Sequence, residues 1–175
     1  MIHESVNTLI ILGSSRNDGN TGALARAVFS SLTDAQLVDL NDHKVGPYDY
    51  DDGNSADDFL PLAQRMVRAR SIVFASPVYW YSMSGQMKLF FDRLTDLTGP
   101  YKAMGKALAD KTMFAIATGG TPSAPESFVS PFADTAGYFD MRWGGLLYAV
   151  GRDGPLTEQD EASAHKFAKA ISATA

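Results

Sequence analysis

Cysteine is absent from this chain of 175 residues. Without cysteine the chain has no disulfide bond, no thiolate nucleophile and no cysteine ligands for an iron–sulfur cluster. Histidine is scarce as well, and the three histidines, His3, His43 and His165, stand far apart in the sequence. No spacing typical of a zinc site can be read from them, so we expect no bound metal.

Long apolar runs and basic blocks are also missing. Residues 1–7 carry acid and histidine rather than basic side chains, and the apolar run at 8–12 is too short for a signal-peptide core or a membrane span. The net charge is −5, and one helical face accounts for the densest cations, Arg65, Arg68 and Arg70. Nucleic-acid binding needs many such contacts to phosphates, so we expect no nucleic-acid partner. These absences predict a soluble, cytoplasmic protein with no membrane span.

What the chain does contain is a regular alternation of strand and helix patterns. Apolar, strand-like runs occur at residues 9–12, 35–40, 71–75, 112–117 and 146–150. Helical spacing of apolar residues follows these runs at 24–32, 59–67, 85–97, 126–139 and 157–173. Pro131 is expected to sit in an early turn of its helix or to break it, and Thr157 is expected to cap the last helix.

This alternation predicts one α/β domain over residues 1–175, with a doubly wound, five-stranded parallel sheet and helices on both faces. Length and number of elements favour the strand order 2-1-3-4-5 of flavodoxin-like proteins. In open sheets of this kind, ligands bind outside the carboxyl ends of the strands at the switch point, here between the first and third strands.

The segment after the first strand, residues 13–21, combines two glycines with short polar side chains and an arginine. A helix N-terminus presents unpaired N–H groups and a partial positive charge, which favour a phosphate dianion. The segment lacks the Gly-Lys-Ser/Thr of a Walker A loop and the Gly-x-Gly-x-x-Gly of a Rossmann dehydrogenase. We interpret it as a phosphate loop, and the alternative is a polar turn with Asn20 as N-cap. The side chains that would add donors are Ser14, Ser15, Arg16, Asn20 and Thr21.

The segment after the third strand reads Ser-Pro-Val-Tyr-Trp-Tyr at residues 76–81. Three adjacent aromatic side chains in a loop cannot all enter the core, and planar rings with polar tips suit a flavin. The alternative is that Tyr79 and Trp80 pack beneath the loop. After the fourth strand, Thr118, Gly119 and Gly120 either offer backbone N–H groups to the flavin's pyrimidine edge or form a simple turn. Since all three segments follow strands, they are expected to converge at the switch point.

Together with residues 84–88 and 91–93, these segments resemble the flavodoxin-like NAD(P)H-dependent FMN reductase family, a group of NAD(P)H:quinone oxidoreductase-type flavoproteins. The resemblance extends over nearly the whole chain and implies FMN as cofactor, with NADPH or NADH as electron donor. Iron–sulfur flavoproteins share the pattern but carry a cysteine cluster, which this chain lacks. The resemblance implies that Ser14, Arg16, Asn20 and Thr21 hold the phosphate, that Pro77, Val78, Tyr79 and Trp80 border the isoalloxazine, and that Thr118, Gly119 and Gly120 lie at its pyrimidine end.

The resemblance also implies a subunit assembly. Members are commonly dimers with the flavin near the subunit contact, so we expect a homodimer or a homotetramer, with Phe90 and Leu94 as candidate contact residues. Residues 41–55 are expected either to border an acceptor pocket or to form a solvated loop. Lys88 is expected to face water, and Asp92 and Arg93 to form structural hydrogen bonds or an ion pair at the end of their helix.

The expected function is therefore an FMN-dependent oxidoreductase. It would take a hydride from NAD(P)H and reduce a quinone, flavin or similar small-molecule acceptor by a ping-pong mechanism. Since the cofactor carries the chemistry, no catalytic residue is predicted. One alternative is an electron-carrier flavodoxin without nicotinamide activity, which the modest net charge and the non-aromatic Thr-Gly-Gly-Thr-Pro after the fourth strand disfavour. Another is an interaction protein that has lost its flavin.

Overall fold

The structure is a computed structural model that describes residues 6–16, 18–51, 53–54 and 56–174. Residues 1–5, which include His3, and both Asn17 and Ser55 carry expectations stated above and lie outside the described residues.

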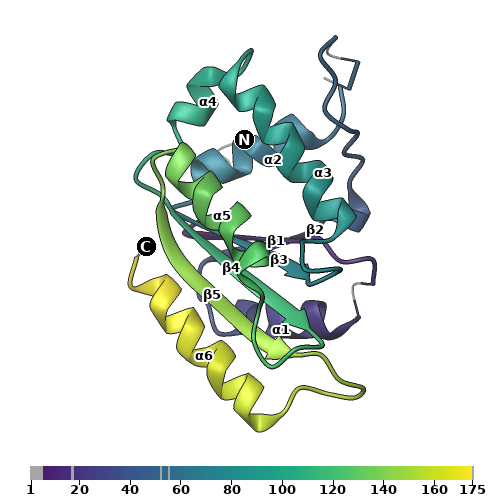
Figure 1. Cartoon of the computed structure of the whole chain (residues 1–175). Helices are drawn as coiled ribbons and strands as arrows, with labels where there is room; N and C mark the ends of the chain where they lie inside the picture. The colour runs from purple at the N-terminus through teal and green to yellow at the C-terminus, as the bar shows by residue number, and fades with distance from the viewer. Residues whose placement is uncertain (1–5, 17, 52, 55, 175) are drawn as a thin grey trace.

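The described chain forms a parallel sheet of five strands in the order β2-β1-β3-β4-β5 (Figure 1). The predicted α/β fold and strand order are confirmed. The order reverses between β1 and β3, so the carboxyl ends of these two strands mark the switch point. The strands are β1 (Thr8–Leu12), β2 (Ala35–Asp39), β3 (Ser71–Pro77), β4 (Thr112–Gly119) and β5 (Arg142–Val150).

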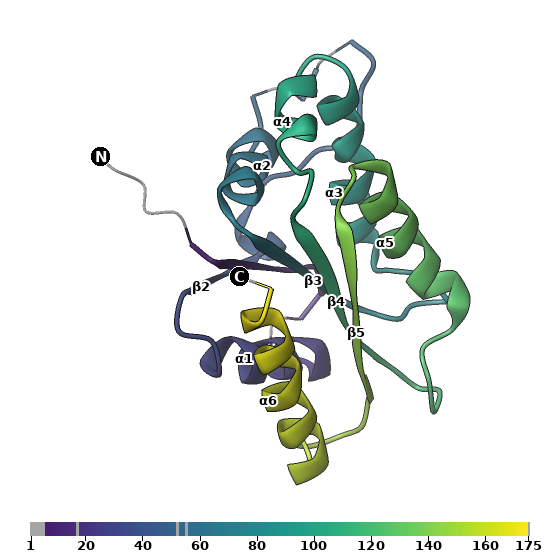
Figure 2. The ribbon, with the colours of Figure 1, turned by 90° about the vertical axis from the view of Figure 1, so that its left-hand side faces the viewer.

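Helices cover both faces of the sheet (Figure 2). One face carries α1 (Asn20–Ser30) and α6 (Glu158–Ser172), which pack against each other as well as on the strands. The other face carries α2 (Phe59–Arg68), α3 (Gly85–Arg93) and α5 (Glu126–Tyr138). The remaining helical elements are the short α4 (Lys102–Lys106) and the 3-10 turns η1 (Leu40–Asp42) and η2 (Leu94–Thr98).

The core consists of two layers that share the central strands. Along β1, Leu9 and Ile11 face the layer under α2, α3 and α5, whereas Ile10 and Leu12 face the layer under α1 and α6. Burial on both faces explains why the strand reads as a continuous apolar run rather than an alternating one. Each such side chain contributes about 2 kcal/mol through removal of apolar area from water.

Phe90 and Leu94 belong to the first of these layers. Phe90 is fully buried, with its ring centroid 5.3 Å from that of Phe59, and Leu94 is 4% exposed. The expectation that these two residues form a subunit contact is wrong, because their apolar surface is already covered within the chain.

The third helix, the segment that follows it and the last strand differ from the sequence-based expectation. The third helix ends at Arg93 and continues as a 3-10 turn, the tighter form that often closes a helix. The short α4 was not predicted, since residues 102–106 show no apolar period. The strand β5 begins at Arg142 rather than at Leu146, because Gly144 and Gly145 interrupt the apolar pattern. A side chain at Gly144 would overlap the ring of Phe114, and Gly145 has φ 109° at a register shift between β4 and β5.

α5 continues unbroken through Pro131 in its second turn.

Arg93 links the end of α3 to the long segment between η1 and α2. Its guanidinium is buried, pairs with Asp57 and donates from Nε to Asp96 Oδ2 at 2.9 Å. Burial acts to lower the pKa of Arg93, but the hydrogen bonds to Asp57 and Asp96 outweigh it and raise the pKa above its ordinary value. The expected structural role of Arg93 is confirmed. Asp92 pairs instead with the exposed Lys88 one helical turn earlier.

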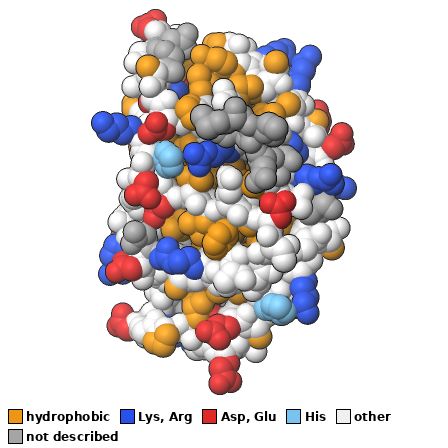
Figure 3. Space-filling view, turned by 180° about the vertical axis from the view of Figure 1, so that it is seen from behind, with side chains coloured by type: hydrophobic (Ala, Val, Ile, Leu, Met, Phe, Trp, Pro, Cys, Tyr) orange, Lys and Arg blue, Asp and Glu red, His pale blue; other side chains and the backbone are white. Residues whose placement is uncertain are grey.

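Charge is mixed on the face opposite to the one seen in Figure 1. On the face seen in Figure 3, acidic and basic side chains are interspersed around small apolar areas. Among the described residues, no helix combines the length and the apolar character needed to cross a membrane.

Candidate functional site

A cavity of about 230 Å³ lies where β1, β3 and β4 end, at the switch point of the sheet. It brings together the three segments singled out in the sequence, and every predicted site residue except Ser15 and Trp80 contributes to its wall. Gly19 and Gly151 complete the lining. The lining residues are Ser14, Arg16, Gly19, Asn20, Thr21, Pro77, Val78, Tyr79, Thr118, Gly119, Gly120 and Gly151.

The loop after β1 is fastened to β3 and to the start of α3. The Gly13 N–H donates to Ala75 O at 2.8 Å, and Ser84 Oγ donates to Gly13 O at 2.7 Å. A Cβ at Gly13 would lie 3.0 to 3.2 Å from atoms of Met87, so a side chain at this position would crowd the first turn of α3. The loop therefore begins from a fixed point on the sheet.

The N-terminus of α1 opens onto the cavity without a capping side chain. Gly19 is the N-cap, Asn20 is the first helical residue, and the first turn contains no acid. The N-cap is therefore Gly19 rather than Asn20, the residue given for it in the polar-turn alternative. The first helical bond runs from the Ala23 N–H to Gly19 O at 2.9 Å, which leaves the N–H groups of Asn20, Thr21 and Gly22 without an acceptor among the described residues. Such a terminus is suited to an anion.

The loop after β3 forms a two-residue hairpin that carries the aromatic side chains. Tyr79 and Ser82 exchange backbone hydrogen bonds of 2.9 and 3.0 Å, and between them Trp80 (φ 49°) and Tyr81 (φ 66°) are both left-handed. This geometry matches the tight turns of β-hairpins but is costly for bulky side chains. Ser127 Oγ holds the turn by donating to Tyr81 O at 2.9 Å.

The hairpin separates the aromatic residues. Tyr79 lines the cavity, whereas Trp80 lies at the tip and is 93% exposed. The alternative in which both pack beneath the loop is wrong. The turn conformation directs Trp80 outward, so its ring stands beside the cavity rather than in its wall.

The loop after β4 touches the phosphate loop directly. Thr118 Oγ1 and Thr21 Oγ1 are 2.6 Å apart, and both residues are buried. Gly119 O accepts from the Gly151 N–H at 2.8 Å, and a Cβ at Gly119 would approach the Tyr148 hydroxyl to 2.9 Å. These contacts form the floor of the cavity, by which we mean the lining residues Thr21, Thr118, Gly119 and Gly151. They join residues that lie far apart in the sequence.

The electrostatic character of the cavity follows from its lining. Arg16 is the one charged side chain among the described lining residues, and none of them is an Asp or Glu. An exposed guanidinium beside free N–H groups favours a phosphate over a cation.

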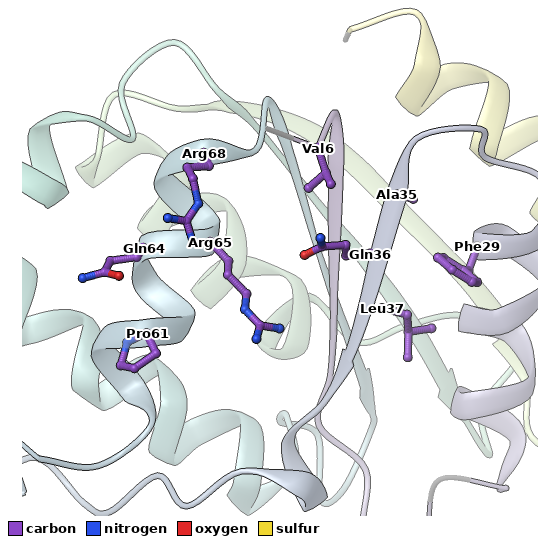
Figure 4. Close-up of a pocket in the computed structure, with 9 residues that line it drawn as sticks. All are labelled: Val6, Phe29, Ala35, Gln36, Leu37, Pro61, Gln64, Arg65 and Arg68. Atoms are coloured by element: carbon purple, nitrogen blue, oxygen red, sulfur yellow. The ribbon is translucent and has the colours of Figure 1, made fainter. Parts of the chain in front are cut away.

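A larger cavity, of about 640 Å³, lies along the edge strand β2, near the amino ends of β1 and β2 and away from the switch point (Figure 4). It is bordered by Arg65 and Arg68 of α2 and by Phe29 of α1. No predicted site residue lines it, and it is open around the strand edge. Size alone therefore does not identify the functional site, whereas the position at the switch point does.

Gly151 was not among the predicted site residues. It follows β5 directly, as Gly13 follows β1 and Gly119 ends β4. Its position immediately after the last predicted strand, like that of Gly13 after the first, is the signal that would have found it.

Comparison with known proteins gives a consistent result. A family model described as NADPH-dependent FMN reductase matches residues 6–142. A Bacillus subtilis protein named as an NAD(P)H-dependent FMN-containing oxidoreductase, YwqN, is 30% identical over 119 residues, which cover 63% of this chain and 65% of that protein. The chain thus spans just under two thirds of this relative's length.

Solved structures share the fold. The Trp repressor binding protein from Bacillus subtilis has a TM-score of 0.73 at 24% identity, with 91% of this chain and 96% of that chain covered. An NADPH-quinone reductase from P. pentosaceus has a TM-score of 0.67 at 17% identity, with 93% and 97% covered.

Proposed function

This chain belongs to the NADPH-dependent FMN reductase family, and on this premise we propose that it binds FMN in the switch-point cavity and transfers a hydride from NAD(P)H to a quinone, a flavin or a similar small acceptor. Family membership makes the protein an oxidoreductase with FMN and a reduced nicotinamide as cofactors. We further propose that residues 1–175 form one FMN-binding domain and that the protein assembles as a homodimer or a homotetramer. The observation that carries the proposal is the convergence of three predicted loops on one cavity.

The residues of the first loop fit a phosphate. The uncapped N-terminus of α1 supplies backbone donors, and the side chains of Ser14, Arg16 and Thr21 border the same space. An Asp or Glu in the first turn of α1 would compete with a phosphate for these donors, and the turn has none. This donor set, with one guanidinium and several N–H groups, is the chemistry that a phosphomonoester requires.

The other two loops fit a flat, partly exposed ring. Tyr79 supplies an aromatic face, and Gly120, whose Cβ position is open, leaves the backbone accessible in the same cavity wall. The backbone N–H groups there would donate to the pyrimidine edge and stabilise negative charge on it. The cavity is smaller than the roughly 300–1,000 Å³ of pockets that enclose a whole ligand, so part of the cofactor would remain open to a second reactant.

Bound FMN supplies reversible hydride transfer, so the protein's residues need only bind, orient and expose it. Because one open side serves both reactants, donor and acceptor would use it in turn. A ping-pong mechanism is therefore part of the proposal.

Anaerobic stopped-flow mixing tests this function. The FMN-loaded protein should lose flavin absorbance when mixed with NADPH or NADH and recover it when a quinone is then added. Free FMN at the same concentration serves as the control for uncatalysed reduction. If neither nicotinamide bleaches the bound flavin, the reductase proposal fails and an electron carrier becomes the better description.

A further inference from the structure

Asn41, in η1 after β2, lies outside the cavity wall but is bonded to the loop that forms it. Its Nδ2 donates to Ser14 O at 2.7 Å and to Asp39 Oδ1 at 2.9 Å. Its Oδ1 accepts from Gln86 Nε2, in the first turn of α3, at 2.6 Å. One amide side chain therefore joins the phosphate loop, the end of β2 and the start of α3.

The chemistry of the neighbours fixes the direction of both amides. If the Asn41 amide were reversed, its oxygen would face the Ser14 carbonyl and the Asp39 carboxylate, which are both acceptors. Gln86 must then present Nε2 to Asn41 Oδ1. The two hydrogen bonds therefore have the same donor-to-acceptor direction, from Gln86 to Asn41 and from Asn41 to the Ser14 carbonyl.

Gln86 makes this bond although its own side chain destabilises the fold. Its Oε1 is buried and has no hydrogen-bond partner within the described residues. A buried acceptor without a partner is destabilising, and an apolar side chain of the same shape, such as Met, avoids that penalty. The feature that distinguishes Gln from Met at this position is the bond from Nε2 to Asn41.

The anchored carbonyl determines where the next N–H points. In a trans peptide, the Ser14 C=O and the Ser15 N–H point in opposite directions. Since Ser14 O is directed at Asn41, the Ser15 N–H is directed away from Asn41. Asn41 is outside the cavity wall, whereas Ser14 and Arg16 border the cavity. No described residue accepts from the Ser15 N–H.

We propose that Asn41, held by Gln86, is a positioning residue for the FMN phosphate: it sets the Ser14–Ser15 peptide plane so that the Ser15 N–H donates to a phosphate oxygen. The inference rests on the proposed function and adds two residues that the cavity lining does not contain. It also gives Ser15 a backbone role, although its side chain is outside the wall.

Titration of the apoprotein with FMN and with riboflavin, which lacks the phosphate, tests this role. Replacing Asn41 by Ala (N41A) should raise the FMN dissociation constant about 5- to 10-fold, the effect of one lost hydrogen bond, and leave riboflavin within about twofold. Gln86→Met should raise the FMN constant about threefold without lowering the urea midpoint of the apoprotein. A residue with a structural role alone would lower the midpoint and leave the ratio of the two constants unchanged.

Asn54→Ala is the matched control. Asn54 lies in the long segment that follows η1, and its Nδ2 also donates to a backbone carbonyl, that of Pro47 at 2.9 Å, away from the phosphate loop. This variant should keep the ratio of the FMN and riboflavin constants at the wild-type value.

Two failures are distinguishable. If the wild-type apoprotein binds neither flavin, the proposed function fails and takes this inference with it. If it binds FMN but N41A and Gln86→Met keep the wild-type ratio of FMN to riboflavin, only the positioning role is overturned. Should N41A not fold, the result with Gln86→Met decides.

Discussion

The guanidinium of Arg93 is surrounded by acceptors from two chain segments. Besides Asp57 and Asp96, it donates to Gly46 O and Asn54 O, each at 3.3 Å, and it lies 4.8 Å from the ring centroid of Phe59. A buried charge of this kind is tolerated because every side of it is compensated. The residue consequently holds Gly46, Asn54 and Asp57 against the end of α3.

Replacing Arg93 by Ala is expected to lower the free energy of unfolding by about 3–5 kcal/mol, because Asp57 and Asp96 would be left without their cation. Arg68, an exposed arginine at the end of α2, is the control, and its replacement by Ala should cost less than about 0.5 kcal/mol. Urea denaturation followed by circular dichroism measures both. A loss below about 1 kcal/mol at Arg93 would contradict the anchoring role.

At the level of single residues, the sequence predicted the loops of the site better than the orientation of their side chains. Residue type and position after a strand were sufficient to place Ser14, Thr21 and Tyr79 in the wall. The position of Trp80 depends on two consecutive residues with left-handed backbone angles. The spacing of apolar residues in the sequence gives no information about backbone angles in a turn. The bond between Asn41 and Ser14 joins parts of the chain that come together only in the folded sheet.

Among the elements, helices and strands with a strong period were predictable, and those formed by packing were not. The continuous apolar runs of β1 and β3 predict that both faces of these strands are buried, as they are in the structure. In α4, Gly105 packs closely against the Leu97 carbonyl, where a side chain would not fit, and such a contact leaves no periodic pattern in the sequence. The early part of β5 is a strand although Gly144 and Gly145 weaken it, because pairing with β4 continues across the irregularity.

The capping box of α6 predicts a pH dependence. Thr157 Oγ1 and the Thr157 N–H donate to Asp160 Oδ2 at 2.6 and 3.1 Å, and the Asp160 N–H donates to Thr157 Oγ1 at 3.2 Å. The side-chain hydrogen bond from Thr157 holds the pKa of Asp160 below its ordinary value. Since the folded-state pKa is the lower one, the carboxylate stabilises the fold above the ordinary carboxyl pKa. That contribution disappears as the pH falls through the folded-state value.

Asp160→Ala should therefore cost about 1 kcal/mol near neutral pH, and the cost should shrink below about pH 4. Glu161→Ala, in the same helical turn, serves as the control, because Glu161 has no part in the capping box. Urea midpoints of wild type and both variants across this pH range provide the measurement. A cost at Asp160 that stays constant with pH would show that its charge is not involved.

For the whole molecule, the proposed assembly is open to a direct test. Sedimentation should give a mass of two or four times the 18.9 kDa chain. Trp80 is the candidate contact, because a strained turn presents it at 93% exposure beside the cavity. Trp80→Ser should weaken association at least about tenfold, the loss expected for a buried aromatic anchor. Phe29→Ser, a change at an exposed aromatic on α1, should leave association unchanged. A monomer at all concentrations would contradict the assembly.

The closed floor of the cavity has a consequence for when the cofactor can enter. Its wall draws on residues from Ser14 to Gly151, and Thr21–Thr118 and Gly119–Gly151 contacts join them across the sheet. No fragment that stops before β5 holds the complete wall, so a half-made or clipped chain lacks the full set of contacts. A chain cut before β5 would then fail to retain flavin, so a preparation clipped there would stay colourless after incubation with FMN.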